Sequence, residues 1–412
     1  MTKLEKLIQE LCPNGVEYKP LGDIATISRG GSFQKKDYTE NGVPCIHYGQ
    51  IYMYYGLFAE KTLTYISEEV AQKQKFAEPG DIIMAVTSEN MDDVCKCMAW
   101  LGSKKIAVSG HTAIIHHSIN PKYLVYWLSS TMFYQQKVKI AHGTKVIEVA
   151  PARLADIILP VPPLPVQREI VRILDNFTEL TAELTAELTA RKQQYAYYRD
   201  KLLTFENFTE WRTLDDVIVS LNTGLNPRQF FKLNPDDAHN YYVTIREIQN
   251  GTIVVSDKTD RINDDALRLC NNRSNLEVGD VLFSGTGTIG ETAVISEPPT
   301  NWNIKEGIYV IKPRKEVLHP RYLMYILRTD ALRSAIFKKV AGGTVKSIPM
   351  AEMRNLRVPV PSLKIQKRLV EVLDNFDSIC TDLSSGLPAE IEARQKQYEY
   401  YRDKLLTFTP AN

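Results

Sequence analysis

The chain has 412 residues and a formal net charge of +1 at pH 7, from 50 basic and 49 acidic residues. Its length accommodates two or three domains, and a hydrophobic content of 44% supports packed cores. The balanced charge argues against a purely electrostatic nucleic-acid binder, and no apolar run reaches the roughly 20 residues of a membrane-spanning helix.

The first residues and the cysteines indicate the compartment. Residues 3–10 alternate charges and lack the apolar core of a signal peptide. The six cysteines are scattered, and Cys95 and Cys97 lie too close together for a usual zinc pair. We therefore expect a cytoplasmic protein with reduced thiols, no structural metal and no membrane segment.

Patterning predicts two α+β globules, each with a long helical segment after it. Short strand-like runs occur at 82–86 and 113–115 in the first half, and at 281–283 and 308–311 in the second. Helical stretches come after them at 121–136 and 320–339. In chain order the segments are an N-terminal helical segment (1–17), a first globule (18–157), a first long helix (158–205), a second globule (206–357) and a second long helix (358–412).

An apolar stripe predicts one helix over residues 166–205. Its members recur in steps of three or four residues, with one step of seven, which is a coiled-coil pattern. At ~1.5 Å per residue, 40 residues span roughly 60 Å, too long for the core of one small domain. The stripe includes Phe177, Leu180, Leu184, Leu188, Tyr195, Tyr198 and Leu202.

A second stripe predicts an interrupted helical segment over residues 365–408. Gly386 and Pro388 fall inside it after two serines, and Pro388 suits the first position of a new helix better than a helix interior. The stripe includes Phe376, Leu383, Tyr398, Tyr401 and Leu405.

The two stripes differ in length by one short sequence unit. Residues 177 to 191, from the Phe to the next Arg, are 14 apart, and the matching residues 376 and 394 are 18 apart. The difference of four equals one Thr-Ala-Glu-Leu unit, which stands in tandem at 181–184 and 185–188.

The chain also repeats itself. Residues 197–205 return unchanged as 400–408, and Leu-Asp-Asn-Phe at 174–177 returns at 373–376. Residues 14–23 align with 207–216, so the N-terminus matches the segment that comes directly after the first long helix. This predicts two related modules in a pseudo-two-fold arrangement with the chain ends close together. The diverged segments between the repeats indicate separate specificities, with neutral drift in loops as the alternative.

One glycine-rich segment suggests chemistry and is better explained as a turn. Residues 285–290 fit G-x-G-x-x-G, but that fingerprint requires a helix next, whereas residues 291–296 have a strand pattern. A glycine-rich hairpin is therefore favoured over a cofactor cradle. His111, His116 and His117 lack partners at ligand spacing, so no catalytic or metal site is predicted.

Candidate nucleic-acid contacts lie in both halves. A basic glycine turn before each Pro-rich stretch suits phosphate oxygens, and a solvated loop is an equally good interpretation. Its members are Gly143, Thr144 and Lys145 in the first half and Gly343, Thr344 and Lys346 in the second. Polar side chains able to bond base edges gather in the diverged segments, although each of them singly is more often ordinary surface. These are Arg29, Lys35, Lys36, His47, Gln50, Ser88, Asn90, Lys104 and Lys105, then Arg228, Arg246, Gln249, Asn272, Arg273, Thr286, Thr288, Asn301, Asn303 and Lys305.

This layout resembles the specificity subunit of a type I restriction-modification enzyme, over essentially the whole chain. The Pro-rich turns with Gln167 and Gln366, the long helices and the two diverged domains carry the resemblance. The tandem Thr-Ala-Glu-Leu and the repeated Tyr-Tyr-Arg-Asp-Lys-Leu-Leu resemble the branch of this family called IC. The resemblance implies an α+β fold with two target recognition domains in pseudo-two-fold arrangement, separated by two long antiparallel coiled-coil helices.

The resemblance also implies a division of labour. Each recognition domain would read one half of a bipartite site in double-stranded DNA, and the helices would dock two methyltransferase subunits. Those partners would use S-adenosylmethionine, and restriction/translocase subunits would use ATP and Mg, with no cofactor in this chain. The alternatives are a coiled-coil adaptor with two domains for ligands other than DNA, and a self-sufficient methyltransferase, which the empty motif search disfavours.

Overall fold

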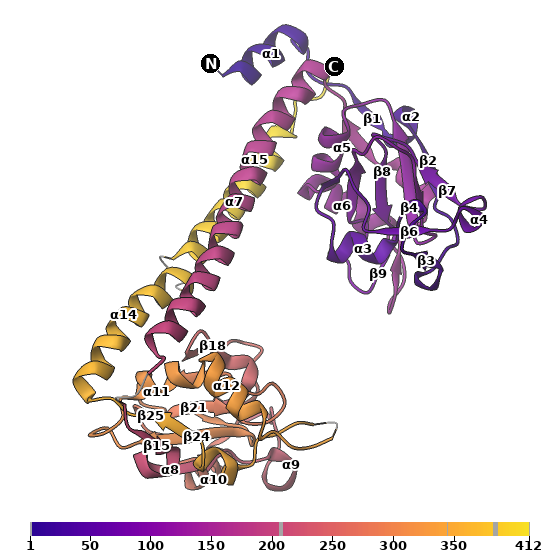
Figure 1. The fold of residues 1–412 in the computed structure, drawn as a ribbon. Coiled ribbons are helices and arrows are strands. Elements are labelled where there is room, and N and C mark those ends of the chain that lie inside the picture. Colours follow the sequence, from indigo (N-terminus) through magenta and orange to yellow (C-terminus); the bar gives the residue numbers. More distant parts are fainter. Residues whose placement is uncertain (1, 206–208, 344, 382–385, 412) are drawn as a thin grey trace. The chain divides into compact units, whose positions relative to one another are not determined.

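The computed structural model describes residues 2–205, 209–343, 345–381 and 386–411 (Figure 1). The chain forms two compact units. Unit 1 comprises residues 1–184 and 391–412, and unit 2 comprises residues 185–390. Each unit contains one mixed α/β domain and parts of the long helices, so the fold class expected from the sequence is confirmed.

Unit 1 contains two five-stranded sheets and short helices. Its helical elements are α1 (Lys3–Leu11), α2 (Leu21–Ile24), η1 (Lys35–Asp37), α3 (Tyr48–Met53), α4 (Glu68–Ala71), α5 (Pro121–Leu128), α6 (Thr131–Ile140) and η2 (Pro151–Asp156). Its strands are β1 (Tyr18–Pro20), β2 (Ala25–Arg29), β3 (Tyr38–Thr39), β4 (Val43–Ile46), β5 (Phe58–Ala59), β6 (Thr64–Ile66), β7 (Lys75–Ala77), β8 (Ile82–Ala85), β9 (Thr87–Ser88), β10 (Cys97–Trp100), β11 (Ile106–Val108), β12 (Thr112–His117), β13 (Ile147–Glu148) and β14 (Ile158–Pro160).

The central strand β8 is buried on both faces. It lies between β12 and β10 in the sheet of order β2-β12-β8-β10-β5, and the second sheet has the order β3-β6-β4-β11-β7. Because side chains alternate along a strand, Ile82 and Met84 join the core under α5, while Ile83 and Ala85 join the core that contains Val108 of β11. This explains why β8 appears in the sequence as an unbroken apolar run.

Unit 2 repeats this plan with smaller sheets. Its helical elements are α8 (Leu214–Val217), α9 (Pro227–Phe230), η3 (Ile245–Glu247), α10 (Asp264–Ser274), α11 (Pro320–Leu327), α12 (Asp330–Phe337) and α13 (Met350–Arg354). Its strands are β15 (Trp211–Thr213), β16 (Ile218–Thr223), β17 (Asn240–Val243), β18 (Ile248–Gln249), β19 (Thr252–Ile253), β20 (Arg261–Ile262), β21 (Val281–Ser284), β22 (Thr292–Val294), β23 (Trp302–Ile304), β24 (Ile308–Pro313) and β25 (Arg357–Pro359).

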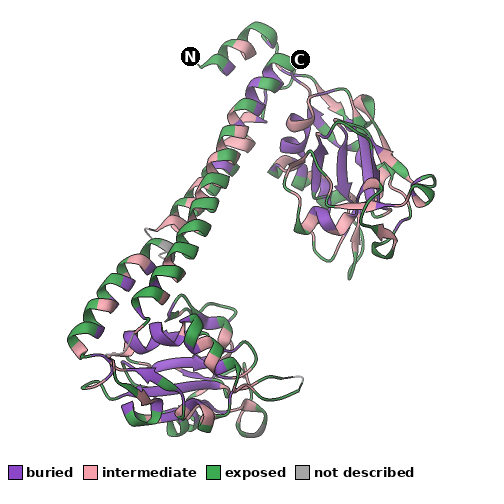
Figure 2. Cartoon of the chain, in the orientation of Figure 1, coloured by how far each residue is buried: buried purple, intermediate pink, exposed green. Residues whose placement is uncertain are grey.

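The central strand of unit 2 is β21, in a sheet of order β16-β24-β21-β22. Val281 and Phe283 face the core that contains α11, and Leu282 faces the core that contains Val243 and Ile304. Figure 2 shows the same burial in each domain, with buried residues on the central strands and on the helix that covers them.

The helical stretch predicted before each Pro-rich segment is two helices rather than one. In unit 1, Ser130 separates α5 from α6, because its side chain accepts a hydrogen bond from the backbone N–H of Phe133 and so caps the start of α6. Thr329 caps α12 in the same way, with Leu332 as donor. Such a capping side chain begins a new helix, but it does not interrupt the apolar periodicity of the sequence. The periodicity alone therefore cannot show the boundary between the two helices.

The long helices match the sequence expectation of one continuous and one divided segment. Helix α7 (Leu164–Leu202) is continuous, whereas the second segment forms α14 (Leu363–Thr381) and α15 (Leu387–Leu405). Pro388 is the second residue of α15, in the first turn, where its missing N–H costs no helical bond. Leu383 and the two serines after it lie outside the described residues.

The chain ends meet in unit 1, as predicted from the repeat. The backbone N–H of Val16 donates to the carbonyl of Thr409 (2.9 Å), and the N–H of Ala411 donates to the carbonyl of Val16 (2.9 Å). The Tyr18 hydroxyl donates to the carbonyl of Phe408 (3.0 Å). The end of the chain is therefore held against the strand that begins the first domain.

None of the helices among the described residues has the length and apolarity to cross a bilayer.

The junction of the chain ends gives the first prediction. Gly15 has φ +97°, and a Cβ there would lie 2.5 Å from the carbonyl oxygen of Pro410. Gly15→Ala is expected to lower the free energy of unfolding by more than about 1 kcal/mol, because strain and a clash with the backbone add. Gly56→Ala is the control, since its Cβ meets nothing within 4 Å. Thermal unfolding of both full-length variants tests this, and equal midpoints would contradict it.

Candidate nucleic-acid interface

The repeated Leu-Asp-Asn-Phe segment holds each domain on a long helix. In unit 1, Asp175 of α7 accepts a hydrogen bond from the hydroxyl of Tyr126 in α5 (2.8 Å). In unit 2, Asp374 of α14 accepts one from the hydroxyl of Tyr325 in α11 (2.5 Å). A cation accompanies each pair, Lys122 in unit 1 and Arg321 in unit 2. The repeated Leu-Asp-Asn-Phe segment therefore anchors each domain to its long helix.

A buried glutamine makes a second repeated anchor. Gln167 accepts from the backbone N–H of Asn120 (2.9 Å) and donates to the carbonyl of Pro162 (2.7 Å). Gln366 accepts from the N–H of His319 (2.8 Å) and donates to the carbonyl of Pro361 (2.7 Å). Both amides satisfy backbone groups where each Pro-rich turn enters its helix, which explains why the turns carry Gln.

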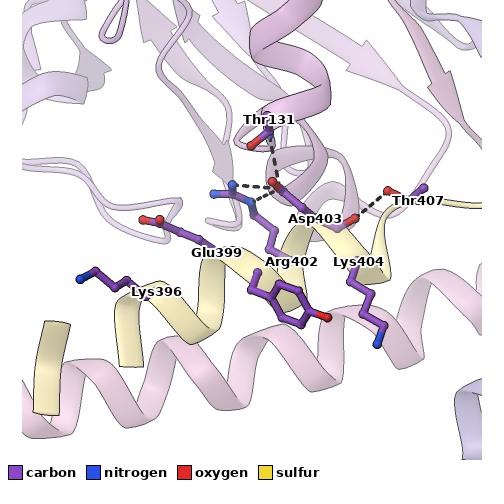
Figure 3. Close-up of a pocket in the computed structure, with 8 residues that line it drawn as sticks. Thr131, Lys396, Glu399, Arg402, Asp403, Lys404 and Thr407 are labelled. Carbon is purple, nitrogen blue, oxygen red and sulfur yellow. Dashed lines mark hydrogen bonds and ion pairs between the residues drawn. The ribbon is translucent and has the colours of Figure 1, made fainter. Parts of the chain in front are cut away.

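The repeated Arg-Asp-Lys segment caps a domain helix (Figure 3). Asp403 accepts from the backbone N–H of Thr131 at the start of α6 (3.3 Å) and pairs with Arg402 (2.9 Å). In unit 2, Asp200 accepts from the N–H of Asp330 at the start of α12 (2.9 Å). A carboxylate at a helix N-terminus satisfies an unpaired donor and the helix dipole. The pocket in Figure 3 is lined by Thr131, Lys396, Glu399, Tyr400, Arg402, Asp403, Lys404 and Thr407.

Aromatic stacking joins the two helices within each unit. Phe177 stacks on Tyr401 with centroids 5.5 Å apart in unit 1, and Tyr198 stacks on Phe376 at 6.2 Å in unit 2. In each unit one helix leaves the domain and the other enters it, so the helices run antiparallel. The predicted stripe is brought together at these residues, and Leu180, Leu184 and Leu188 are half-buried.

The stripe differs from the prediction at the helix ends. Leu202 is 36% exposed and Leu405 is only half-buried, while Leu203 and Leu406 are buried. The last turn of each helix faces its own domain as well as the other helix. The buried position therefore moves by one residue from the coiled-coil stripe.

In unit 1, a polar groove gathers cationic and aromatic side chains at one edge of the domain. Arg29 at the end of β2 is oriented by its Nε–H, which donates to the carbonyl of Gly110 (2.9 Å), and by Glu148 (3.2 Å). The exposed side chains of Lys73 and Lys75 lie along the same groove. Its lining comprises Arg29, Gly30, Gly31, Ser32, Phe33, Gln34, His47, Tyr48, Lys73, Lys75, Ser109, Gly110 and His111.

Of this lining only Arg29 and His47 were candidates from the sequence, which missed Tyr48, Lys73, Lys75 and His111 among others. They come from separate elements, and Lys75 of β7 belongs to a different sheet from Arg29 of β2, so only tertiary packing brings them together. Their spacing in the sequence carries no signal, because the residues in between belong to other parts of the domain.

In unit 1, the basic glycine turn pairs with the segment that comes after the central strand. Strand β13 after the turn pairs with β9, so Ile147 lies opposite Ser88. The turn is closed by backbone hydrogen bonds between His142 and Glu148 (2.8 and 3.0 Å). The exposed Gly143, Thr144 and Lys145 are therefore placed beside Ser88.

Unit 2 has the same arrangement. The N–H of Gly287 donates to the carbonyl of Lys346 (2.9 Å), and Thr286 forms a bridge with Ser347. The glycine-rich segment continues antiparallel from β21 into β22, which confirms the hairpin interpretation. Gly343 and Lys346 therefore lie beside Thr286, while Thr344 lies outside the described residues.

A second group of candidates in unit 2 meets at Gly224 and Leu225. Arg273 donates to the carbonyl of Gly224 (3.3 Å), and Lys305 forms a bridge with Leu225. Of the remaining candidates, Arg246 is neutralised by Asp260 (3.0 Å) and Gln249 donates to the carbonyl of Arg246. Arg228, Asn272, Thr288 and Asn301 are exposed.

Three candidates are largely buried, although His47 also lines the groove of unit 1. Asn303 is fully buried and bonds Ser274 (2.8 Å) and Asn271 (2.7 Å), so its role is to join α10 to β23. Gln50 accepts from the backbone N–H of His47 (2.9 Å) and closes the first turn of α3. Burial, and to a smaller degree Lys35 and His111, lowers the pKa of His47, whose Nδ1 accepts from the N–H of Gly49.

Two pairs of lysines, Lys104 with Lys105 and Lys35 with Lys36, do not line the groove. Lys104 and Lys105 come after the end of β10 that pairs with Ile82, opposite the end of β8 that leads to Ser88. Lys105 lies over the ring of Phe76, 5.0 Å from its centroid. Lys35 and Lys36 are exposed in η1, and Asn90 is exposed in the segment after β9.

The candidate residues of both domains are suited to binding a ligand through hydrogen bonds and charge. Cations, amides and hydroxyls project from loops, and no group of three or more metal-ligating side chains occurs in the described part of the chain. The described cysteines Cys12, Cys45, Cys95, Cys97 and Cys270 are free and buried.

Comparisons with known proteins agree with this arrangement. The family described as type I restriction modification DNA specificity domain matches residues 13–191 and 209–393. The chain is 31% identical over 428 residues to the EcoR124I/EcoR124II type I restriction enzyme specificity subunit of Escherichia coli, covering 99% of this chain and 97% of that protein. It is 27% identical over 422 residues to a putative type I restriction enzyme specificity subunit of Haemophilus influenzae, covering 99% of each.

One solved structure, from work on complex assembly and conformational transition of the type I R-M system, shares the fold. The TM-score is 0.62 at 16% identity, with 96% of this chain and 98% of that chain covered.

The groove of unit 1 gives the second prediction. Replacing Lys73 and Lys75 together by Gln is expected to weaken binding to double-stranded DNA and to lower the log–log salt slope by about two, one for each lost phosphate contact. Neither lysine forms an ion pair with any described residue, so the fold should be unaffected. The matched control replaces Lys104 and Lys105 by Gln. A salt titration checks this, and equal slopes for both variants would count against the groove.

Proposed function

The chain belongs to the type I restriction-modification DNA specificity family, and we propose that each unit reads one half of a bipartite site in double-stranded DNA. As a specificity subunit it recognises DNA and is not the catalyst, since the enzymatic activities of such systems lie in partner subunits. Family membership leaves the adaptor for ligands other than DNA without support.

One observation carries the proposal of two half-sites. In both units the segment after the central strand pairs with a basic glycine turn, through Ser88 and Ile147 in one unit and Thr286 and Ser347 in the other. This backbone pairing is the same in both units, but the side chains on the paired segments differ. The same backbone arrangement with different side chains suits two half-sites of different sequence.

The two kinds of contact have separate roles. Lys145, Lys346 and the backbone N–H groups of the glycine turns contact phosphates and fix the position of each domain on the duplex. Arg29, Ser88 and Asn90 in unit 1 contact base edges, because Arg and Asn match guanine and adenine. Thr286, Thr288, Asn301, Arg273 and Lys305 do so in unit 2.

The partner subunits dock on the repeated helix ends. Tyr197 and Tyr400 are each 61% exposed, and each lies 5.8 Å from the ammonium of the lysine four residues later. Because the same exposed pair occurs once in each unit, two identical subunits can be held. We assign these sites to two methyltransferase subunits that bring S-adenosylmethionine, with motor subunits that bring ATP and Mg, in the cytoplasm.

The helices set the distance between the half-sites, as in the IC branch. Residues 181–188 are helical within α7, so each Thr-Ala-Glu-Leu unit adds helix length without disturbing either domain. Four residues add ~6 Å of rise, which is close to the length of two base pairs.

Changing the helix length tests the spacing. Inserting one further Thr-Ala-Glu-Leu after Leu188 is expected to lengthen the unspecified gap in the methylated target and to leave both half-sites unchanged, because only helical rise is added. Sequencing methylated genomic DNA from cells that express the variant with its partner subunits measures this. An unchanged gap would reject the helix as the ruler.

Exchanging one domain tests modular reading. Replacing residues 18–157 by the corresponding residues of a relative should change one half-site and preserve the other, because the second unit keeps its own core and loops. The methylated motif is again the readout. A change in both half-sites would show that the units do not read separately.

A further inference from the structure

Lys137 of α6 is a buried cation that takes no part in the proposed DNA contacts. It is 5% exposed, and its ammonium donates to the backbone carbonyls of Asp92 (2.9 Å) and Val94 (2.8 Å). It also lies 4.9 Å from the ring centroid of Tyr134. Both hydrogen bonds point to one feature, the segment between β8 and β10.

This segment contains two candidate base contacts. Residues 87–94, which we call the first reading loop, include Ser88 and Asn90. Ser88 pairs with Ile147 beside the basic glycine turn, and the exposed Asn90 comes two residues later. The conformation of this loop therefore decides where these side chains are presented.

In the second unit, the connection after the central strand is held without a buried cation at the matching position. Offset by 199 residues, the position of Lys137 is Ile336, which is buried in an apolar core. There, residues 285–291 join β21 to β22, a span of seven, whereas residues 86–96 join β8 to β10, a span of eleven. The shorter connection carries three glycines and closes as a hairpin, but the longer one has none.

Side chains therefore have to hold the longer loop. The hydroxyl of Tyr52 donates to the carbonyl of Thr87 (2.7 Å), and that of Tyr134 donates to Asp92 (3.2 Å). Asn90 and Asp93 exchange two hydrogen bonds (2.8 Å each). Lys137 adds a support that reaches the loop from the buried side, through two backbone carbonyls.

Stability does not account for this lysine. Burial lowers the pKa of Lys137, so the ammonium is held at a cost that the nearby carboxylate of Asp92 only partly offsets. An apolar side chain of similar volume is often as stable as a buried ion or more so. Its partners are backbone carbonyls of one loop, which makes loop geometry the property that it controls.

We propose that Lys137 is a positioning residue that fixes the first reading loop and thereby sets the sequence preference of one half-site alone. The proposal rests on the proposed function. Lys137 does not contact DNA, so its effect is on discrimination between sequences and not on phosphate binding.

The test compares Lys137→Met with its matched control, Ile336→Met, in the full chain assembled with its methyltransferase subunits. Selection from a randomised DNA pool is expected to show that Lys137→Met reduces discrimination at the first half-site about tenfold, comparable to the loss of one good base contact. The second half-site and the affinity for random DNA should stay unchanged. Ile336→Met should leave the preference for both half-sites unchanged.

Two further variants keep the proposal falsifiable if Lys137→Met does not fold. Lys137→Arg keeps a cation that can donate to both carbonyls and should restore most of the preference. Tyr134→Phe removes only the hydroxyl bonded to Asp92 from a partly exposed ring, and should relax the same half-site to a smaller degree.

The outcomes separate the two proposals. Equal loss at both half-sites, or no loss at either in all of these variants, would overturn the role of Lys137. If the unaltered chain selected no two-part sequence at all, the proposed function would fail instead.

Discussion

Each domain of this protein is tied to a long helix by a carboxylate that accepts a tyrosine hydroxyl, and the rest of the architecture depends on this tie. Asp175 and Asp374 make the same bond to a buried tyrosine of the helix that covers the central strand. The bond joins the core of a domain to the long helix. A helix can set the proposed distance between half-sites only if each domain is fixed on it.

The pattern of sequence repetition is a consequence of these ties. Positions that hold domain to helix must satisfy buried polar groups, and a lost partner there costs more than a lost surface contact. Gln167 and Gln366 are of this kind, whereas the exposed caps from Asp403 and Asp200 satisfy donors at helix N-termini. Loops that face outward carry no such requirement, so their sequences are free to differ between the units. Repeated anchor residues and diverged loops are the expected result when two domains share one way of attaching to a helix but present different loop surfaces.

Much of the fold could be predicted from the sequence because it depends on local patterns and on the repeat. The continuous α7, the strands β8 and β21, the glycine hairpin and the meeting of the chain ends are examples. The boundary between α5 and α6 was missed because a capping Ser does not interrupt the helical period. Leu203 and Leu406 replaced their neighbours in the core because the last helical turn packs on a domain as well as on a helix.

The candidate interface was harder to predict, since residue type does not give burial. Asn303 has the chemistry of a base reader but is buried and bonds Ser274 and Asn271. Lys73 and Lys75 could be assigned to the groove of Arg29 only from the tertiary structure. The burial of Lys137 under a loop could not be inferred without the tertiary contacts.

Missing-base interference on a target duplex, with the full chain in its assembled complex, tests the central account most directly. Removing single bases should impair binding within two short blocks, separated by a gap in which removal is tolerated. One continuous sensitive block, or no sensitive base at all, would contradict two separate reading units held apart by helices.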